Sequence, residues 1–194
     1  MDKVSKAVEF ATKAHSGQIR KNSKFPYIIH PLRVAETVAR FTDDKDAIVA
    51  GILHDIIEET DYNLDYIKTH FGTRVADIVS NLSEPNKTEP WEVRKTHTIK
   101  LLQSTKDMHL LLVSCADKLD NLVSLKRDCI QHGDCAWRTF HQGRDKQKWY
   151  YDALAKTYMD FDKKNQLFRK FNKSVQKNFH PKFHQKILNI FRKK

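Results

Sequence analysis

The chain has 194 residues, of which 40% are hydrophobic, so it can bury one core but hardly two, and we expect a single compact domain. Its formal net charge of +11 arises after Asp162, where eleven Lys and Arg residues occur without an acidic one. The three cysteines are odd in number and form no CxxC pair, so a disulfide framework is not indicated and a reducing cytoplasm fits best. No apolar run is long enough for a signal peptide or a membrane span, so we expect a soluble protein.

Apolar residues recur at three- and four-residue spacing along most of the chain, which predicts an all-α fold of about ten helices. Gly72 is placed as the stop between two short helices, and the two prolines of "SEPNKTEPW" predict an internal loop before the next helix. The pattern predicts helices over residues 2–15, from 30 to about 41, and over 44–58, 63–71, 73–83, 92–104, 108–128, 137–161, 165–179 and 182–192.

The stretch "ILHDIIEET", residues 52–60, brings four titratable side chains into an otherwise apolar helix. Residues four apart share one helical face, so His54 is paired with Glu58 and Asp55 with Glu59. A core histidine beside solvated glutamates is the plainer interpretation, and the motif alone favours it.

Asp117 lies within the apolar run "LLLVSCADKLDNL", where a buried carboxylate is costly unless it is paired or binds a metal. An ion pair with Lys118 is the alternative, although adjacent helical positions do not face each other. His30, His54, Asp55 and Asp117 together offer two imidazoles and two carboxylates, a set suited to Mn²⁺, Fe²⁺ or similar ions. Such a centre favours metal-assisted phosphoester hydrolysis.

These residues resemble the H…HD…D signature of the HD-domain phosphohydrolases. More narrowly, "AHSGQIRKNSKFPYIIHP", "ILHDIIEET", "EPNKTEPWEVRKTHTI" and "CADKLDNL" are similar, in order, to four motifs of the RelA/SpoT-type small alarmone hydrolases. The similarity runs from about residue 7 to residue 126, more weakly to about residue 178. It implies a compact multi-helix HD-domain bundle.

The resemblance implies hydrolysis of the 3′-diphosphate of (p)ppGpp to GDP or GTP and pyrophosphate, usually with Mn²⁺, which would restrain stringent-response signalling. It implies these roles: metal ligands His30, His54, Asp55 and Asp117; water-orienting or proton-accepting Glu58 and Glu59; and substrate-binding Arg20, Lys21, Tyr27, Lys87 and Asn121. The sequence leaves open which glutamate handles the proton.

Basic side chains near these motifs suit a highly charged nucleotide. For Arg94 and Lys95, ordinary solvated charge and a substrate role are equally favoured. One position departs from the family pattern, because related enzymes usually read "EDT" where this chain reads "EET". The extra methylene of Glu59 moves its carboxylate by roughly 1.5 Å, and a misplacement of about 1 Å can lower a rate a hundredfold.

We expect a hydrolase domain over residues 1–178 and a basic amphipathic extension over 179–194. The extension could contact an anionic membrane, nucleic acid or an acidic partner, although no dedicated nucleic-acid motif is present. Residues 165–178 should place an apolar stripe against the hydrolase. We expect a monomer or homodimer, and no synthetase domain within this length.

Two further functions remain compatible with the sequence. The same centre could act on (p)ppApp or on the 2′-phosphate of NADPH. Alternatively, the chain could be a catalytically weak binding or antitoxin-like protein, with Glu59 as the altered residue.

Overall fold

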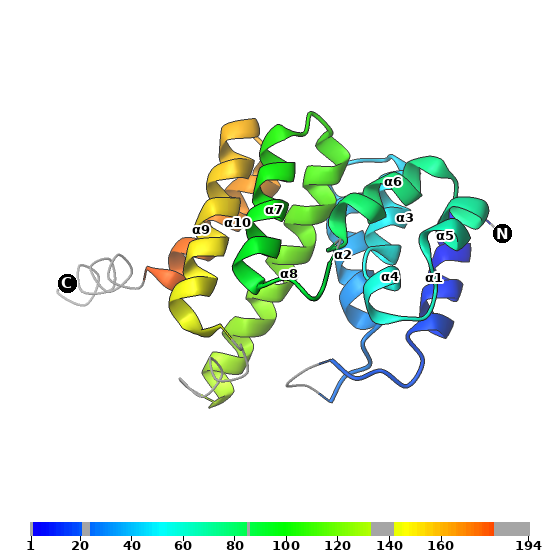
Figure 1. Cartoon of the computed structure of the whole chain (residues 1–194), viewed down its shortest axis with the longest axis horizontal. Coiled ribbons are helices and arrows are strands. Elements are labelled where there is room, and N and C mark those ends of the chain that lie inside the picture. Colours follow the sequence, from blue (N-terminus) through cyan, green and yellow to red (C-terminus); the bar gives the residue numbers. More distant parts are fainter. Residues whose placement is uncertain (1, 21–23, 85, 133–141, 181–194) are drawn as a thin grey trace, which may run out of the picture. The chain divides into compact units, whose positions relative to one another are not determined.

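The computed structural model describes residues 2–20, 24–84, 86–132 and 142–180, and within them the fold is all-α, as predicted (Figure 1). The chain divides into two compact units, Met1–Asp120 and Asn121–Lys194. The predicted boundary between residues 178 and 179 remains a prediction, as does the helix over 182–192, which lies outside the described residues. The helices are α1 Lys3–Ala14, α2 Ile29–Ala39, α3 Lys45–Leu53, α4 Ile56–Glu59, α5 Leu64–Phe71, α6 Thr73–Leu82, α7 Trp91–Ser104, α8 Met108–His132, α9 Gly143–Phe161 and α10 Gln166–Phe179.

Helix α3 is the central element of the first unit and packs against α1, α2 and α6. Its residues Ile52 and Leu53 are fully buried, and so is Ile56 at the start of α4. Gly51 allows α2 and α3 to approach closely, because a Cβ at this position would lie only 3.2 Å from the Cα of Ala35. Helices α2 and α3 therefore lie against each other, with His30 in the first turn of α2 and His54 directly after the end of α3.

Two short helices, α5 and α6, are joined at Gly72, whose φ of +87° is the left-handed conformation that glycine adopts readily. The predicted break at this residue is confirmed. Helix α6 is in turn tied to the beginning of α8, because the guanidinium of Arg74 donates two hydrogen bonds, of 2.6 and 2.7 Å, to the carboxylate of Asp107. Asp107 Oδ1 also accepts the backbone N–H groups of His109 and Leu110 at the start of α8.

In the second unit, α10 packs on α9 through an apolar stripe. Phe168 stacks on Tyr158 of α9 with ring centroids 5.4 Å apart, and both side chains are fully buried. Leu167, Phe171, Val175 and Phe179 extend the buried stripe, whereas Arg169, Lys170, Lys173 and Lys177 are exposed. The predicted amphipathic character of this helix is confirmed. Across the described ranges, no helix combines the length and apolarity that a bilayer crossing requires.

Candidate metal centre

The helix predicted over residues 44–58 is interrupted at the His54-Asp55 doublet, so the prediction of one unbroken helix is wrong. Helix α3 ends at Leu53 and α4 begins at Ile56, with His54 and Asp55 forming a turn between them. At the break, His54 Nδ1 lies 2.9 Å from the carbonyl oxygen of Gly51, the oxygen that the backbone N–H of Asp55 would meet in a continuous α-helix. The doublet therefore lies on a turn, and helical stacking does not place its side chains.

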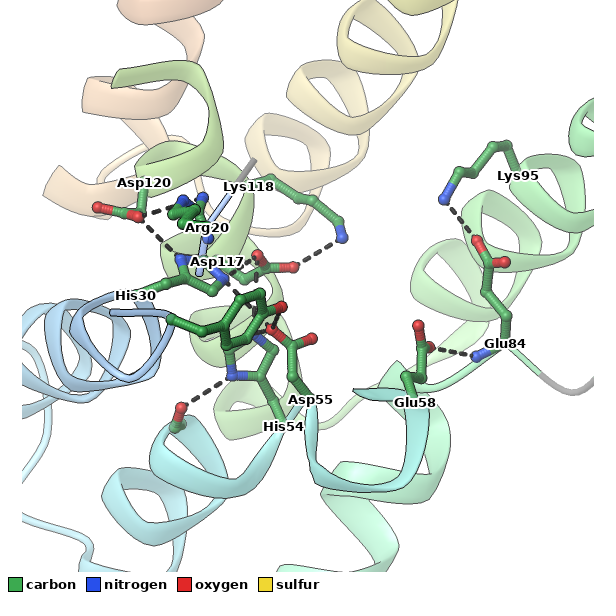
Figure 2. Close-up of polar contacts among 12 residues, drawn as sticks. Arg20, His30, His54, Asp55, Glu58, Glu84, Lys95, Asp117, Lys118 and Asp120 are labelled. Atoms are coloured by element: carbon green, nitrogen blue, oxygen red, sulfur yellow. Dashed lines mark hydrogen bonds and ion pairs between the residues drawn. The ribbon is translucent and has the colours of Figure 1, made fainter. Parts of the chain in front are cut away.

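Three separate elements bring the predicted ligands together in the first unit (Figure 2). His30 is at the start of α2, His54 and Asp55 form the turn between α3 and α4, and Asp117 lies on α8. His30 and His54 are almost fully buried, at 2% and 4% exposure, and Asp117 is 7% exposed. Candidate ligand atoms of these three residues all lie within 4.8 Å of one another.

Asp55 completes the group, since its Oδ2 lies 3.2 Å from His54 Nε2 and 3.5 Å from His30 Nε2. Asp117 Oδ1 lies 3.2 Å from His30 Nε2 and 3.7 Å from His54 Nε2. Neighbouring ligands of an octahedral ion with bonds of about 2.1 Å are about 3 Å apart. The spacing of these four side chains is therefore close to what a single divalent ion requires. We call His30, His54, Asp55 and Asp117 the metal group.

The other ring nitrogens fix which atom of each histidine is available. Nδ1 of His54 donates to the Gly51 carbonyl, and Nδ1 of His30, 2.8 Å from Asp120 Oδ2, donates to that carboxylate. In the neutral rings, both Nε2 atoms then carry lone pairs that face two carboxylates. Within the described part of the chain, buried His54 Nε2 has no hydrogen-bond partner. A cation among these four groups satisfies all of them, so the residues fit a divalent metal.

The electrostatics of the group agree with this geometry. Burial alone disfavours the charged imidazole, but the carboxylates of Asp55 and Asp117 outweigh it and raise the pKa of His54 well above its usual range. Burial likewise opposes ionisation of Asp117, yet the Lys118 ammonium and the two imidazoles hold the pKa of Asp117 well below its usual range. The group is thus anionic and attracts either protons or a metal ion.

Lys118 does pair with Asp117, with Nζ 2.6 Å from Asp117 Oδ2, so the expectation that these neighbours do not meet is wrong. The flexible four-carbon stem of lysine allows its ammonium to reach the preceding residue. The pair uses Oδ2 of Asp117, whereas Oδ1 faces the histidines. The ion pair and the metal interpretation are therefore compatible.

The two glutamates of "EET" have different surroundings. Glu58 is half-buried, and its Oε1 accepts the backbone N–H of Glu84 at 2.8 Å. Burial, with a contribution from Asp55, raises the pKa of Glu58. Glu59 is exposed. Glu58 is therefore the carboxylate held beside the metal group.

Three of the five predicted substrate-binding residues, Arg20, Tyr27 and Lys87, have contacts near this group in the first unit. The hydroxyl of Tyr27 donates to Asp55 Oδ2 at 2.7 Å, and burial beside Asp55 raises the pKa of Tyr27. Arg20 lies 3.6 Å from Asp120 Oδ2, and Lys87 donates to the carbonyl oxygen of Glu58 at 2.6 Å. Lys21 lies outside the described residues, and Asn121 is the first residue of the second unit.

Two residues of the site were not predicted from the sequence. Asp120 orients His30 and faces Arg20, and Glu84 donates its backbone N–H to Glu58. A signal existed for Asp120, since it lies three residues after Asp117 and so on the same face of α8. Nothing in the sequence separates Glu84 from other loop glutamates.

Comparison with known proteins places the chain in a family. The HD domain model matches residues 7–141. The chain is 37% identical over 125 residues to a guanosine-3′,5′-bis(diphosphate) 3′-pyrophosphohydrolase of Aquifex aeolicus, covering 64% of this chain and 18% of that protein. It is 33% identical over 125 residues to a GTP pyrophosphokinase of Streptomyces antibioticus, covering 63% and 15%. The chain thus spans less than a fifth of the length of these curated relatives.

Two solved structures match more completely. The protein lmo0812 of Listeria monocytogenes EGD-e is 35% identical, with a TM-score of 0.71, over 78% of this chain and 99% of that one. A metazoan SpoT ortholog that hydrolyzes ppGpp is 20% identical, with a TM-score of 0.73, over 92% and 97% of the two chains, and shows the shared fold. With these matches and its His-Asp centre, the chain belongs to the HD domain family.

Proposed function

We propose that this chain is a Mn²⁺-dependent hydrolase that removes the 3′-diphosphate of (p)ppGpp, releasing GDP or GTP and pyrophosphate. The observation that carries the proposal is the convergence of two oriented imidazoles and two carboxylates beside the half-buried Glu58. The names of the 3′-pyrophosphohydrolases among its relatives support the choice of substrate.

His30, His54, Asp55 and Asp117 would hold the metal. A bound divalent ion would lower the pKa of water and neutralise phosphoryl oxygens. Tyr27 and Asp120 act on the ligands, because Tyr27 donates to Asp55 and Asp120 fixes the tautomer of His30.

Glu58 is the proton acceptor that the geometry supports best. Its carboxylate is held by the Glu84 N–H, and its raised pKa brings it nearer to the operating pH, as a general base requires. Water attacks the phosphorus attached to the 3′ oxygen while Glu58 takes a proton from the water. The bond between that phosphorus and the 3′ oxygen breaks, and the oxygen gains a proton to become the 3′-hydroxyl of the product.

Cations on both sides of the metal group would suit the charge of the nucleotide. Arg20 and Arg33 face Asp120, and Lys87 is held at the backbone of Glu58. The predicted roles of Lys21 and Asn121 in substrate binding stay proposals, and so does any partner of the basic extension. Cytoplasmic location and a monomeric or homodimeric state also remain predictions.

The test is incubation of the purified full chain with Mn²⁺ and ppGpp, pppGpp, ppApp or NADPH, with products resolved by anion-exchange chromatography. GDP and pyrophosphate from ppGpp, lost on chelation, are the expected result. Faster turnover of ppApp or NADPH would redirect the assignment to an adenosine substrate. Metal binding without turnover of any compound would refute hydrolysis and favour a binding protein.

Asp55→Asn is the matched variant for the metal assignment. It preserves the size of the side chain but removes one anionic ligand, so both Mn²⁺ binding and turnover should be lost. Circular dichroism should show that the helices persist. Asp77→Asn is the control, because Asp77 is exposed on α6 and the same charge change there should leave both properties intact.

A further inference from the structure

A cluster of three cations lies on the Glu58 side of the metal group, in the first unit. Arg94 and Lys95 come from α7 and Lys118 from α8. The guanidinium of Arg94 and the ammonium of Lys95 both contact the carboxylate of Glu84, one on each oxygen. Figure 2 shows the ammonium of Lys95 pointing at Glu84 and the ammonium of Lys118 paired with Asp117.

These cations are unusually shielded for the side chains of a helical surface. The side chains of Arg94, Lys95 and Lys118 are 21%, 18% and 23% exposed, and that of Glu84 is only 10% exposed. Partly buried cations are costly unless anions compensate them. Arg94 and Lys95 share the carboxylate of Glu84, while Lys118 pairs with Asp117, which belongs to the metal group.

The pKa of Lys95 is shifted by its burial and by the other two cations. Burial, and then repulsion by Lys118 and Arg94, lowers the pKa of Lys95 to about 7, while the Glu58 and Asp117 carboxylates act in the opposite direction. Among the neighbouring charges, Lys118 has the largest effect on the pKa of Glu58, which it lowers. Lys95, Lys118 and Glu58 therefore share one electrostatic environment, in which a further anion would be stabilised.

Glu84 connects this environment to the proposed proton acceptor. Its side chain receives Arg94 and Lys95, and its backbone N–H donates to Glu58 Oε1 at 2.8 Å. A change confined to the Glu84 carboxylate leaves the N–H in place. The two roles of this residue can thus be separated experimentally.

We propose that Arg94, Lys95 and Lys118 form a diphosphate-binding site next to the metal group, which the Glu84 carboxylate occupies as an internal counter-ion until a phosphate replaces it. The ligand class is a pyrophosphate group, either free or esterified at one end to the ribose of a nucleotide. This inference rests on the proposed function, in which the diphosphate is the group transferred to water. Competition by Glu84 also favours release of the pyrophosphate product.

The experiment is isothermal titration calorimetry of inorganic pyrophosphate into the full chain, at one fixed free Mn²⁺ concentration. Lys95→Met keeps the apolar stem and removes the charge, so pyrophosphate should bind about ten- to a hundredfold more weakly, as expected for loss of a charge-assisted hydrogen bond. Lys118→Met should act in the same direction. Glu84→Gln removes the competing charge, so pyrophosphate should bind roughly three- to tenfold more tightly.

Glu89→Gln is the matched control, because Glu89 is exposed in the same loop and loses the same charge. Its pyrophosphate affinity should stay within about twofold of the parent value, which separates a local effect from one of net charge. Thermal melting verifies that each variant is folded.

Unchanged affinity in Lys95→Met, or equal or weaker binding in folded Glu84→Gln, would overturn the inference. If the contacts of Glu84 only stabilise the local structure, Glu84→Gln should bind pyrophosphate equally well or more weakly. Should Glu84→Gln fail to fold, the two lysine variants still decide. The experiment measures binding, so it is independent of turnover. If the variants bind pyrophosphate as expected but no nucleotide is hydrolysed, the proposed function is rejected and the pyrophosphate site is retained.

Discussion

Replacing Asp120 with asparagine should weaken Mn²⁺ binding without removing a metal ligand. Asp120 Oδ2 accepts Nδ1–H of His30 at 2.8 Å, and the carboxylate is 10% exposed, so water cannot readily take its place. An asparagine carbonyl can still accept this hydrogen bond, but without the charge that strengthens it. Its NH₂ group can instead face Nδ1, which would favour the tautomer whose Nε2 carries the proton.

The size of the effect follows from the partners of the histidine. Loss of the group that orients a metal-bound histidine typically lowers metal affinity by about 10- to 100-fold, which corresponds to about 1.4–2.7 kcal/mol. A hydrogen bond to a charged group is worth about 1.5–3 kcal/mol, and the amide retains part of it. We therefore expect Asp120→Asn near the lower end, about tenfold.

Calorimetric titration of Mn²⁺ into the chelator-treated and dialysed protein measures this change directly. Asp77→Asn, an exposed substitution on α6, is the control and should bind Mn²⁺ as the parent does. Turnover at saturating Mn²⁺ then separates metal loss from a direct effect on chemistry. A folded Asp120→Asn protein with Mn²⁺ affinity within twofold of the parent would refute the orienting role of Asp120.

Three further predictions follow from the same geometry. Glu58→Gln should lower kcat about 10²- to 10⁴-fold, the usual contribution of a general base, whereas exposed Glu59→Gln should lower it far less; equal losses in steady-state assays would contradict this assignment. Gly51→Ala should destabilise the protein by about 1–3 kcal/mol in urea denaturation and weaken Mn²⁺ binding, because its Cβ would lie 3.2 Å from Ala35 Cα; a neutral result would show that α2 and α3 can separate at no cost. In protein freed of metal by a chelator, the pKa of His54 is raised above its ordinary value of 6.5, so protonation of His54 stabilises the fold fully at pH values below 6.5. This stabilisation is lost as the pH rises through the raised pKa of the folded protein. The melting temperature should decline over that pH range, and added Mn²⁺ should remove the decline.

The sequence predicted the helices well where periodicity and stop signals agreed. Gly72 separates α5 from α6 as expected, and α7 begins directly after Pro90. The break at His54 was not predictable from periodicity, because its apolar neighbours Ile52 and Ile56 continue the helical pattern. The break coincides with a side-chain hydrogen bond from His54 to the carbonyl of Gly51, and a pattern of apolar residues does not encode such a bond.

The sequence predicted the candidate metal ligands more completely than the residues that hold the site residues in place. His30, His54 and Asp117 are recognisable because titratable residues in apolar helices need a reason to be there. Asp120 and Glu84 act through partners distant in the sequence, since Asp120 meets His30 and the backbone N–H of Glu84 meets Glu58. Such pairings arise from tertiary packing, so a single sequence carries little trace of them.

The anchoring of α8 by Arg74 and Asp107 limits how the chain can change in length. With the beginning of α8 fixed, each residue inserted between Met108 and Asp117 would turn Asp117 by about 100° around the helix axis, away from His30. A single insertion there would thus dismantle the centre, even though every ligand remained in the sequence. Spacing within this segment is consequently a stricter signature of a working centre than the identity of the residues on its outer face.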